Sequence, residues 1–213
     1  MRSSGTMRSL LLVPWILACG APSAKPSVSA DVPEASRPAA ATEPWAVPDG
    51  FRGEVIPFPL DFAPGLAHQG LEELRFAPGF FDPAADGYWA YAFAWRTSDP
   101  AELDAAALGA ELTTYFRGLI GAVDEAHVIT DRAAIVARAE AAGSRFTLTA
   151  HVFDAFKTKL PLDLVGWAER RACSHGAVWR FVLAPADTPL RPQLEALAAE
   201  AVCDQPVATG THQ

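Results

Sequence analysis

The run DGYWAYAFAWR, residues 86–96, constrains the fold of this chain more than any other segment. Its alternation puts aromatic side chains on one face of a strand and alanines on the other. Neither face is polar, so we expect a central strand that is covered on both sides. We interpret the aromatic row as core, and the alternative is that it lines a cavity for an apolar ligand. The row consists of Trp89, Tyr91, Phe93 and Trp95.

Four further segments have the composition of strands. Residues 52–65 and 69–81 carry β-branched and aromatic side chains between Pro and Gly. Pro57 places the first of these strands at a sheet edge, because proline has no N–H to donate to a neighbouring strand. Residues 160–171 and 177–185 form another pair of strands, joined by a short turn.

The segment 130–143 has two interpretations. It can form an Ala-rich helix capped by Asp131, or a strand that turns into the clearly alternating segment 145–153. We favour the second interpretation, a β-hairpin.

Two helices complete the expected domain. Asp99 has the character of an N-cap, with Pro100 at the first helical position, and the apolar stripe continues to about residue 121. A last helix runs from Pro189 to Cys203. Strands in runs and separate helices predict an α+β fold, a single domain with a mainly antiparallel sheet and two helices packed on one face.

The N-terminus indicates export. Arg2 and Arg8 precede an apolar run of eight residues, which is too short to span a bilayer but suits a secretory leader. The motif Ile16-Leu17-Ala18-Cys19 resembles the lipobox of bacterial lipoprotein signal peptides. That resemblance implies cleavage of residues 1–18 and lipidation of Cys19. The alternative is an ordinary signal peptide cut near Ala18.

The rest of the chain divides by composition. Residues 19–44 are rich in Ala, Pro and Ser and are expected to be a flexible tether, residues 45–204 a folded domain, and residues 205–213 a flexible tail. Gly20 stands where an Asp would retain a lipoprotein in the inner membrane. The resemblance therefore implies a membrane lipoprotein of the cell envelope, facing the periplasm or exterior, at the outer membrane.

Cys173 and Cys203 are expected to form a disulfide, because an even cysteine pair in an exported chain is usually oxidised. A helix returning antiparallel along strand 177–184 would also bring Cys203 back to the turn that holds Cys173. The alternative is a catalytic thiol assisted by His175, but no third group completes such a site.

Charged residues within apolar strands are the candidate binding site. Glu73 and Arg75, with Asp154, could grip an anionic or zwitterionic ligand through the planar guanidinium. The alternative is an ion pair that fixes strand register. A small hydrolase-like enzyme would use the same residues, with His151 as a further candidate.

Several segments resemble a group of uncharacterised secreted or lipid-anchored bacterial proteins of unknown function. They are PFPLDFAPG, EELRFAPGFFDP, YWAYAFAW and VFDAFKTKLPLDL. The resemblance implies an exported single domain and brings no activity with it.

Composition and motifs limit the classes of function that this chain can have. The net charge of −8 and the lack of basic clusters argue against a nucleic-acid partner. Metal, phosphate and nucleophile motifs are missing from the sequence, so we expect no metal and no cofactor. We therefore expect a non-catalytic binding module of the envelope, attached to the membrane by its lipid, whose partner is an envelope protein or component. The alternative functions are a small-ligand carrier and the enzyme above.

Overall fold

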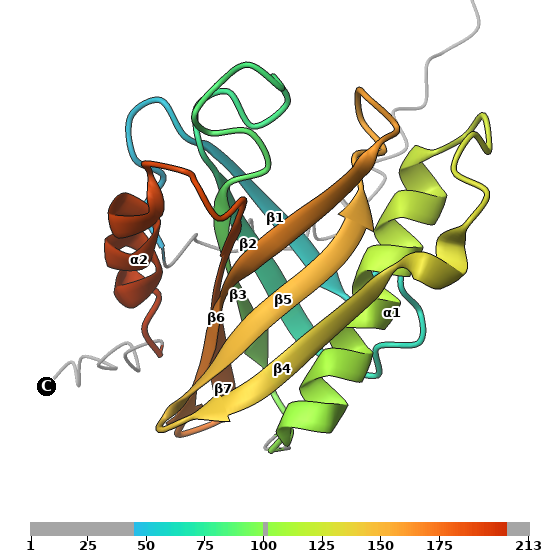
Figure 1. The fold of residues 1–213 in the computed structure, drawn as a ribbon. Coiled ribbons are helices and arrows are strands. Elements are labelled where there is room, and N and C mark those ends of the chain that lie inside the picture. The colour runs from blue at the N-terminus through green and yellow to red at the C-terminus, as the bar shows by residue number, and fades with distance from the viewer. Residues whose placement is uncertain (1–44, 100–101, 204–213) are drawn as a thin grey trace, which may run out of the picture. The chain divides into compact units, whose positions relative to one another are not determined.

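In the part of the chain that the structure describes, seven antiparallel strands form one sheet, and two helices pack against it (Figure 1). The computed structural model describes residues 45–99 and 102–203, which all belong to one compact unit, Thr42–Gln213. The strand order across the sheet is β1-β2-β3-β7-β6-β5-β4. The elements are β1 (Arg52–Phe58), β2 (Gly70–Phe76), β3 (Tyr91–Thr97), α1 (Ala105–Val123), the 3-10 turn η1 (Arg132–Ala134), β4 (Val136–Ala142), β5 (Arg145–Phe153), β6 (Pro161–Cys173), β7 (Gly176–Ala184) and α2 (Arg191–Glu200).

The strand expected at the centre is an interior strand. β3 pairs with β2 on one side and β7 on the other, and each of its seven residues is buried. β1, which contains Pro57, lies at an edge of the sheet, as the proline predicts. The α+β class and the mainly antiparallel sheet are confirmed.

The two faces of the sheet bury different side chains. Phe93 and Trp95 lie in one apolar cluster with Leu112 of α1. Ala92 and its alternating neighbours lie in a second cluster, which includes Leu194 of α2. The alternation of β3 thus separates a thick aromatic layer from a thin alanine layer.

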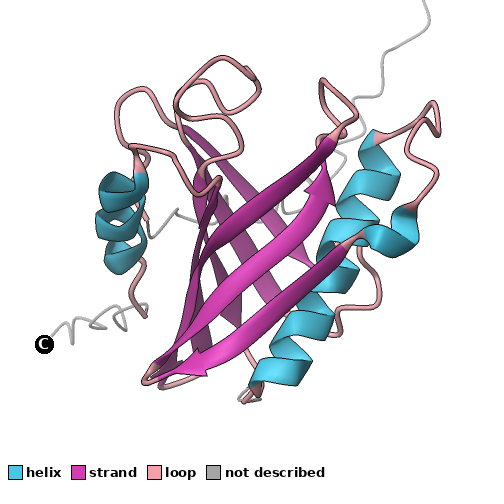
Figure 2. Cartoon of the chain, viewed as in Figure 1, coloured by secondary structure: helices cyan, strands magenta, loops and turns pink. Residues whose placement is uncertain are grey.

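The helices therefore pack on opposite faces of the sheet, and their expected placement on one face is wrong (Figure 2). The physical reason is the strand itself. A strand that is apolar on both faces needs a cover on each side, and α1 and α2 provide one cover each.

The start of α1 also differs from the expectation. The helix begins at Ala105, and its N-cap is Asp104, whose carboxylate accepts a hydrogen bond from the N–H of Ala107 at 2.8 Å. Asp99 instead contacts the ring of His68, with 3.1 Å between Oδ2 and Nδ1. The tertiary partner outweighs the local capping signal.

The ambiguous segment is a hairpin, as favoured. β4 and β5 pair from Val136 with His151 to Ala142 with Arg145, and Gly143 in the turn has a φ of +64°. The helical alternative fails because β4 packs closely against α1. A Cβ on Gly109 would lie 3.3 Å from the carbonyl oxygen of Ala137.

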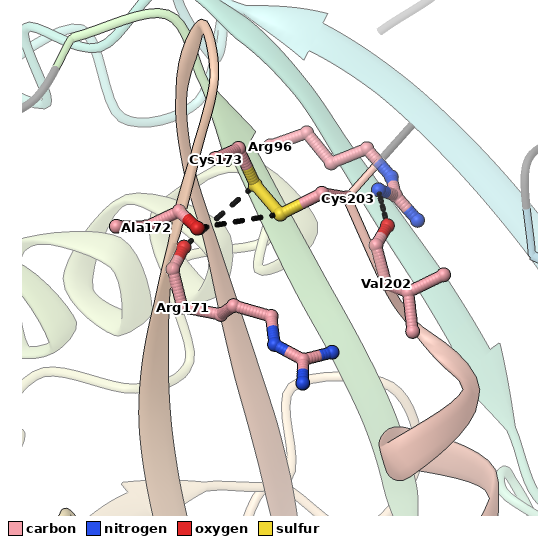
Figure 3. The surroundings of a disulfide bond; sticks show 6 residues. All are labelled: Arg96, Arg171, Ala172, Cys173, Val202 and Cys203. Carbon is pink, nitrogen blue, oxygen red and sulfur yellow. Dashed lines mark hydrogen bonds between the residues drawn. A yellow bond between two sulfur atoms is a disulfide. The ribbon is translucent and has the colours of Figure 1, made fainter. Parts of the chain in front are cut away.

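The cysteine pair lies at disulfide distance, as expected. The sulfur atoms of Cys173 and Cys203 are 1.98 Å apart (Figure 3). α2 ends at Glu200, earlier than predicted, and the extended residues after it carry Cys203 to the end of β6. Arg96 donates a hydrogen bond to the carbonyl oxygen of Val202 beside the bond. Cys173 is therefore not a free thiol, and the alternative with His175 is wrong.

No helix within residues 45–99 and 102–203 is long and apolar enough to cross a membrane. The predicted signal peptide, Cys19, the tether and the tail lie outside the described residues.

Candidate functional site

Glu73 and Arg75 are together, but they do not form an open binding site. Both side chains are fully buried on the α2 face, with 3.6 Å between the Arg75 Nη2 and the Glu73 Oε1. Arg96 from β3 donates a hydrogen bond to the same carboxylate. The alternative interpretation, an ion pair that connects neighbouring strands, describes this arrangement.

Arg75 also holds the beginning of the folded domain. Its guanidinium stacks on the ring of Trp45 at 4.7 Å, and it donates hydrogen bonds to the carbonyl oxygens of Trp45 and Ala46. The guanidinium fork therefore fixes the backbone from which the predicted tether extends.

Asp154 lies elsewhere, in the loop after β5. Its carboxylate accepts hydrogen bonds from the hydroxyl of Tyr88 at 2.7 Å and the indole N–H of Trp89 at 3.1 Å. It also accepts N–H groups of its own loop, from Phe156, Lys157 and Thr158. Burial opposes ionisation, but these hydrogen bonds outweigh it and lower the pKa of Asp154 to about 2.

The proposed carboxylate–arginine enzyme site is not formed. Glu73 and Arg75 face α2, whereas Asp154 binds residues of the aromatic cluster on the opposite face. His151 pairs on the surface with Asp163, with 2.6 Å between Nδ1 and Oδ1. The prediction that Glu73, Arg75 and Asp154 form one site is wrong. Sequence spacing does not show with which loop a carboxylate forms its hydrogen bonds.

Asp154 connects two loops that carry aromatic side chains. Trp89, at the end of the loop between β2 and β3, has a φ of +49°, which is rare for a bulky residue. The Trp89 ring lies 5.5 Å from that of Phe156 in the loop after β5. The ring of Phe81 lies 5.0 Å from the Phe156 ring. These contacts build one wall of aromatic rings.

A pocket of about 300 Å³ lies against this wall, under the C-terminal half of α1. We call it the aromatic pocket. Eight of its fifteen lining residues are aromatic, and Leu119 and Val123 close it from the helix. Its volume lies at the lower end of the range of roughly 300–1,000 Å³ that is typical of small-molecule sites.

The mouth of the aromatic pocket carries its only charged lining residues. Arg52 and Glu54 form an ion pair of 3.0 Å, with side chains 59% and 41% exposed. The Arg52 guanidinium lies over the rings of Phe76 and Phe81, at 5.3 and 5.4 Å. The two charges cancel at the rim, so the pocket has no net charge at its entrance.

A buried acid, Glu72 of β2, lies on the same face of the sheet as the aromatic pocket. One carboxyl oxygen of Glu72 accepts the indole N–H of Trp95 at 3.0 Å, and its side chain is fully buried. Burial raises the pKa of Glu72 to about 8, against the opposing effect of the polar groups of Trp95 and Tyr115. The carboxyl is therefore mostly protonated at pH 7.

The aromatic row has two roles that the sequence did not separate. Phe93 is packed core, with its ring stacked 4.3 Å from that of Phe181. Trp89 and Tyr91 line the aromatic pocket. A usable signal was the position of Phe81 and Phe156 in loops between strands, because loops carry many of the binding residues of proteins.

The described part of the chain contains no group of three or more His, Cys, Asp or Glu side chains arranged to hold a metal ion. Comparison of the chain with protein-family models, with curated proteins and with solved structures finds no match.

Proposed function

We propose that this protein is a lipid-anchored envelope protein that binds a small, mainly apolar molecule in the aromatic pocket. The observation that carries the proposal is the pocket itself, a ring-lined space of about 300 Å³ in an otherwise packed cluster. This proposal joins the two expectations of a binding module and a small-ligand carrier.

The construction of the walls supports a preformed site. Asp154 joins the two loops through hydrogen bonds from Tyr88 and Trp89, and it accepts three more from N–H groups of its own loop. The rings of Phe80, Trp89 and Phe156 lie within 6.2 Å of one another. A pocket that is held open by its own framework does not lose binding energy to ordering.

The location of the protein is proposed from its sequence. Cys19 would carry the lipid, and residues 19–44 would tether the domain to the membrane, with the outer membrane favoured by Gly20. Changing Cys19→Ser should move the protein from the membrane fraction to the soluble extracytoplasmic fraction. An unchanged membrane fraction would contradict the lipid anchor.

Binding is tested by filling the pocket. Ala122 lines the mouth and is exposed, so Ala122→Trp should block the space without disturbing the core. Equilibrium dialysis of the full chain with naphthalene should show saturable 1:1 uptake, weakened at least about tenfold in this variant. Ala110→Trp, an exposed position of the same helix away from the pocket, should bind as the wild type does.

Absence of saturable uptake by the wild type would refute the proposal. Equal uptake by the two tryptophan variants would place the binding site elsewhere on the protein.

A further inference from the structure

Two polar atoms lie buried on the sheet face that carries the aromatic pocket. Tyr91 lines the pocket and is 2% exposed, and its hydroxyl has no hydrogen-bond partner among the described residues. The second carboxyl oxygen of Glu72, on the same face of the sheet, likewise has none among them. Nearly all buried polar groups in proteins are hydrogen-bonded, so this pair needs an explanation.

The pocket supplies the explanation, because a bound molecule could provide the missing partner. A tyrosine hydroxyl both donates and accepts, and a protonated carboxyl does the same. A ligand group that reaches Tyr91 would satisfy a polar atom that otherwise stays buried at a cost.

The charge of the ligand group follows from the surroundings. The rings around Tyr91 are Phe76, Phe80 and Phe93, with centroids 5.2 to 6.0 Å away. Burial raises the pKa of Glu72 to about 8, and burial and the nearby Glu72 carboxyl raise the pKa of Tyr91 well above its usual value. Both groups are therefore mostly neutral at pH 7, and a charged ligand group would lose its hydration there without a counter-ion.

From this geometry we infer that the ligand of the aromatic pocket is an alcohol or phenol, a ring-sized apolar molecule whose hydroxyl hydrogen-bonds to that of Tyr91. The inference rests on the proposed function. At the packing density of protein interiors, ~0.74, the pocket holds a molecule of up to about 220 Å³. A bicyclic ring system with one hydroxyl satisfies this limit.

Three probes of one shape test the ligand class. They are naphthalene, 2-naphthol, which is uncharged at pH 7, and 2-naphthoate, which is an anion. By equilibrium dialysis against the full chain, we expect 2-naphthol to bind about 3- to 10-fold more tightly than naphthalene, the gain of one net hydrogen bond. We expect 2-naphthoate to bind at least about 10-fold more weakly than naphthalene.

Tyr91→Phe identifies the group responsible. This variant removes only a hydroxyl without a partner among the described residues, so we expect it to fold with an unchanged or raised melting temperature. Saturable naphthalene binding by this variant shows an intact pocket, and its affinity for 2-naphthol is compared with its own affinity for naphthalene. Its preference for 2-naphthol should disappear.

The outcomes separate the two proposals. If naphthalene binds and 2-naphthol binds no tighter, the hydroxyl inference is overturned while the binding function stands. A preference for 2-naphthol that persists in Tyr91→Phe, or tightest binding of 2-naphthoate, also overturns the inference. If none of the three probes binds, the binding function itself fails.

Discussion

Neighbouring residues of β2 have different roles because they face opposite sides of the sheet. Glu73 and Arg75 lie on the α2 face, where each charge has an opposite charge in reach. Glu72 lies on the α1 face, where the polar neighbours are the indole of Trp95 and the hydroxyl of Tyr115, which are neutral. A one-residue shift along a strand thus decides whether a carboxyl is ion-paired or desolvated.

The buried acid should make stability depend on pH. The folded protein keeps a proton on Glu72 up to about pH 8, whereas the usual pKa is 4.5. Between these values the folded state binds more protons than the unfolded state. The free energy of unfolding should therefore fall as pH rises, by up to about 1.4 kcal/mol per pH unit.

Glu72→Gln should remove this contribution. Urea unfolding at pH 5, 6, 7 and 8 should show the variant gaining stability relative to the wild type as pH rises. Glu140→Gln, which changes an exposed carboxyl on β4, serves as the control and should run parallel to the wild type. Parallel curves for Glu72→Gln would show that Glu72 titrates normally.

At the scale of elements, loops and strands both form the aromatic pocket. The chain between β2 and β3 and the loop after β5 are 66 residues apart at Tyr88 and Asp154, yet one carboxylate joins them. The sheet provides the floor of the aromatic pocket, and these loops provide a wall of rings.

Asp154→Asn should loosen this wall. The amide keeps one acceptor oxygen but loses the charge, so we expect the free energy of unfolding to fall by about 1.5–3 kcal/mol. Asp163→Asn changes a carboxylate whose side chain is 80% exposed and should stay within about 0.5 kcal/mol of the wild type. Chemical denaturation measures both variants, and equal losses would contradict the special role of Asp154.

At the scale of the whole molecule, the sheet separates the aromatic pocket from the disulfide. The aromatic pocket lies on the α1 face, and the disulfide closes the α2 face, where Cys173 and Cys203 pack beside the second apolar cluster. Stability contributed on one face should therefore be separable from binding on the other.

The double change Cys173→Ser and Cys203→Ser should test this separation. The cysteines are 30 residues apart, and the chain-entropy model gives a loss of about 3–4 kcal/mol when such a crosslink is removed. Urea unfolding should show this loss, while the affinity for naphthalene at low temperature should match that of the wild type. A weakened affinity in a fully folded variant would show that the two faces are coupled.

Sequence patterns alone determined much of the framework. Alternation at residues 86–96 and 145–153 identified strands, Pro57 marked an edge, and the remaining cysteine pair indicated the crosslink. These are local signals, because side-chain direction in a strand depends only on position along it.

Only the tertiary structure decided the arrangement of the helices and the site. Asp99 had a capping pattern but binds His68, which comes from a distant loop, and Asp104 caps α1 instead. Asp154 was expected to bind a ligand, but its carboxylate instead accepts hydrogen bonds from Tyr88 and Trp89 and so holds a wall of the aromatic pocket. Such roles depend on partners far apart in the chain, and the spacing of residues does not show which loops contact each other.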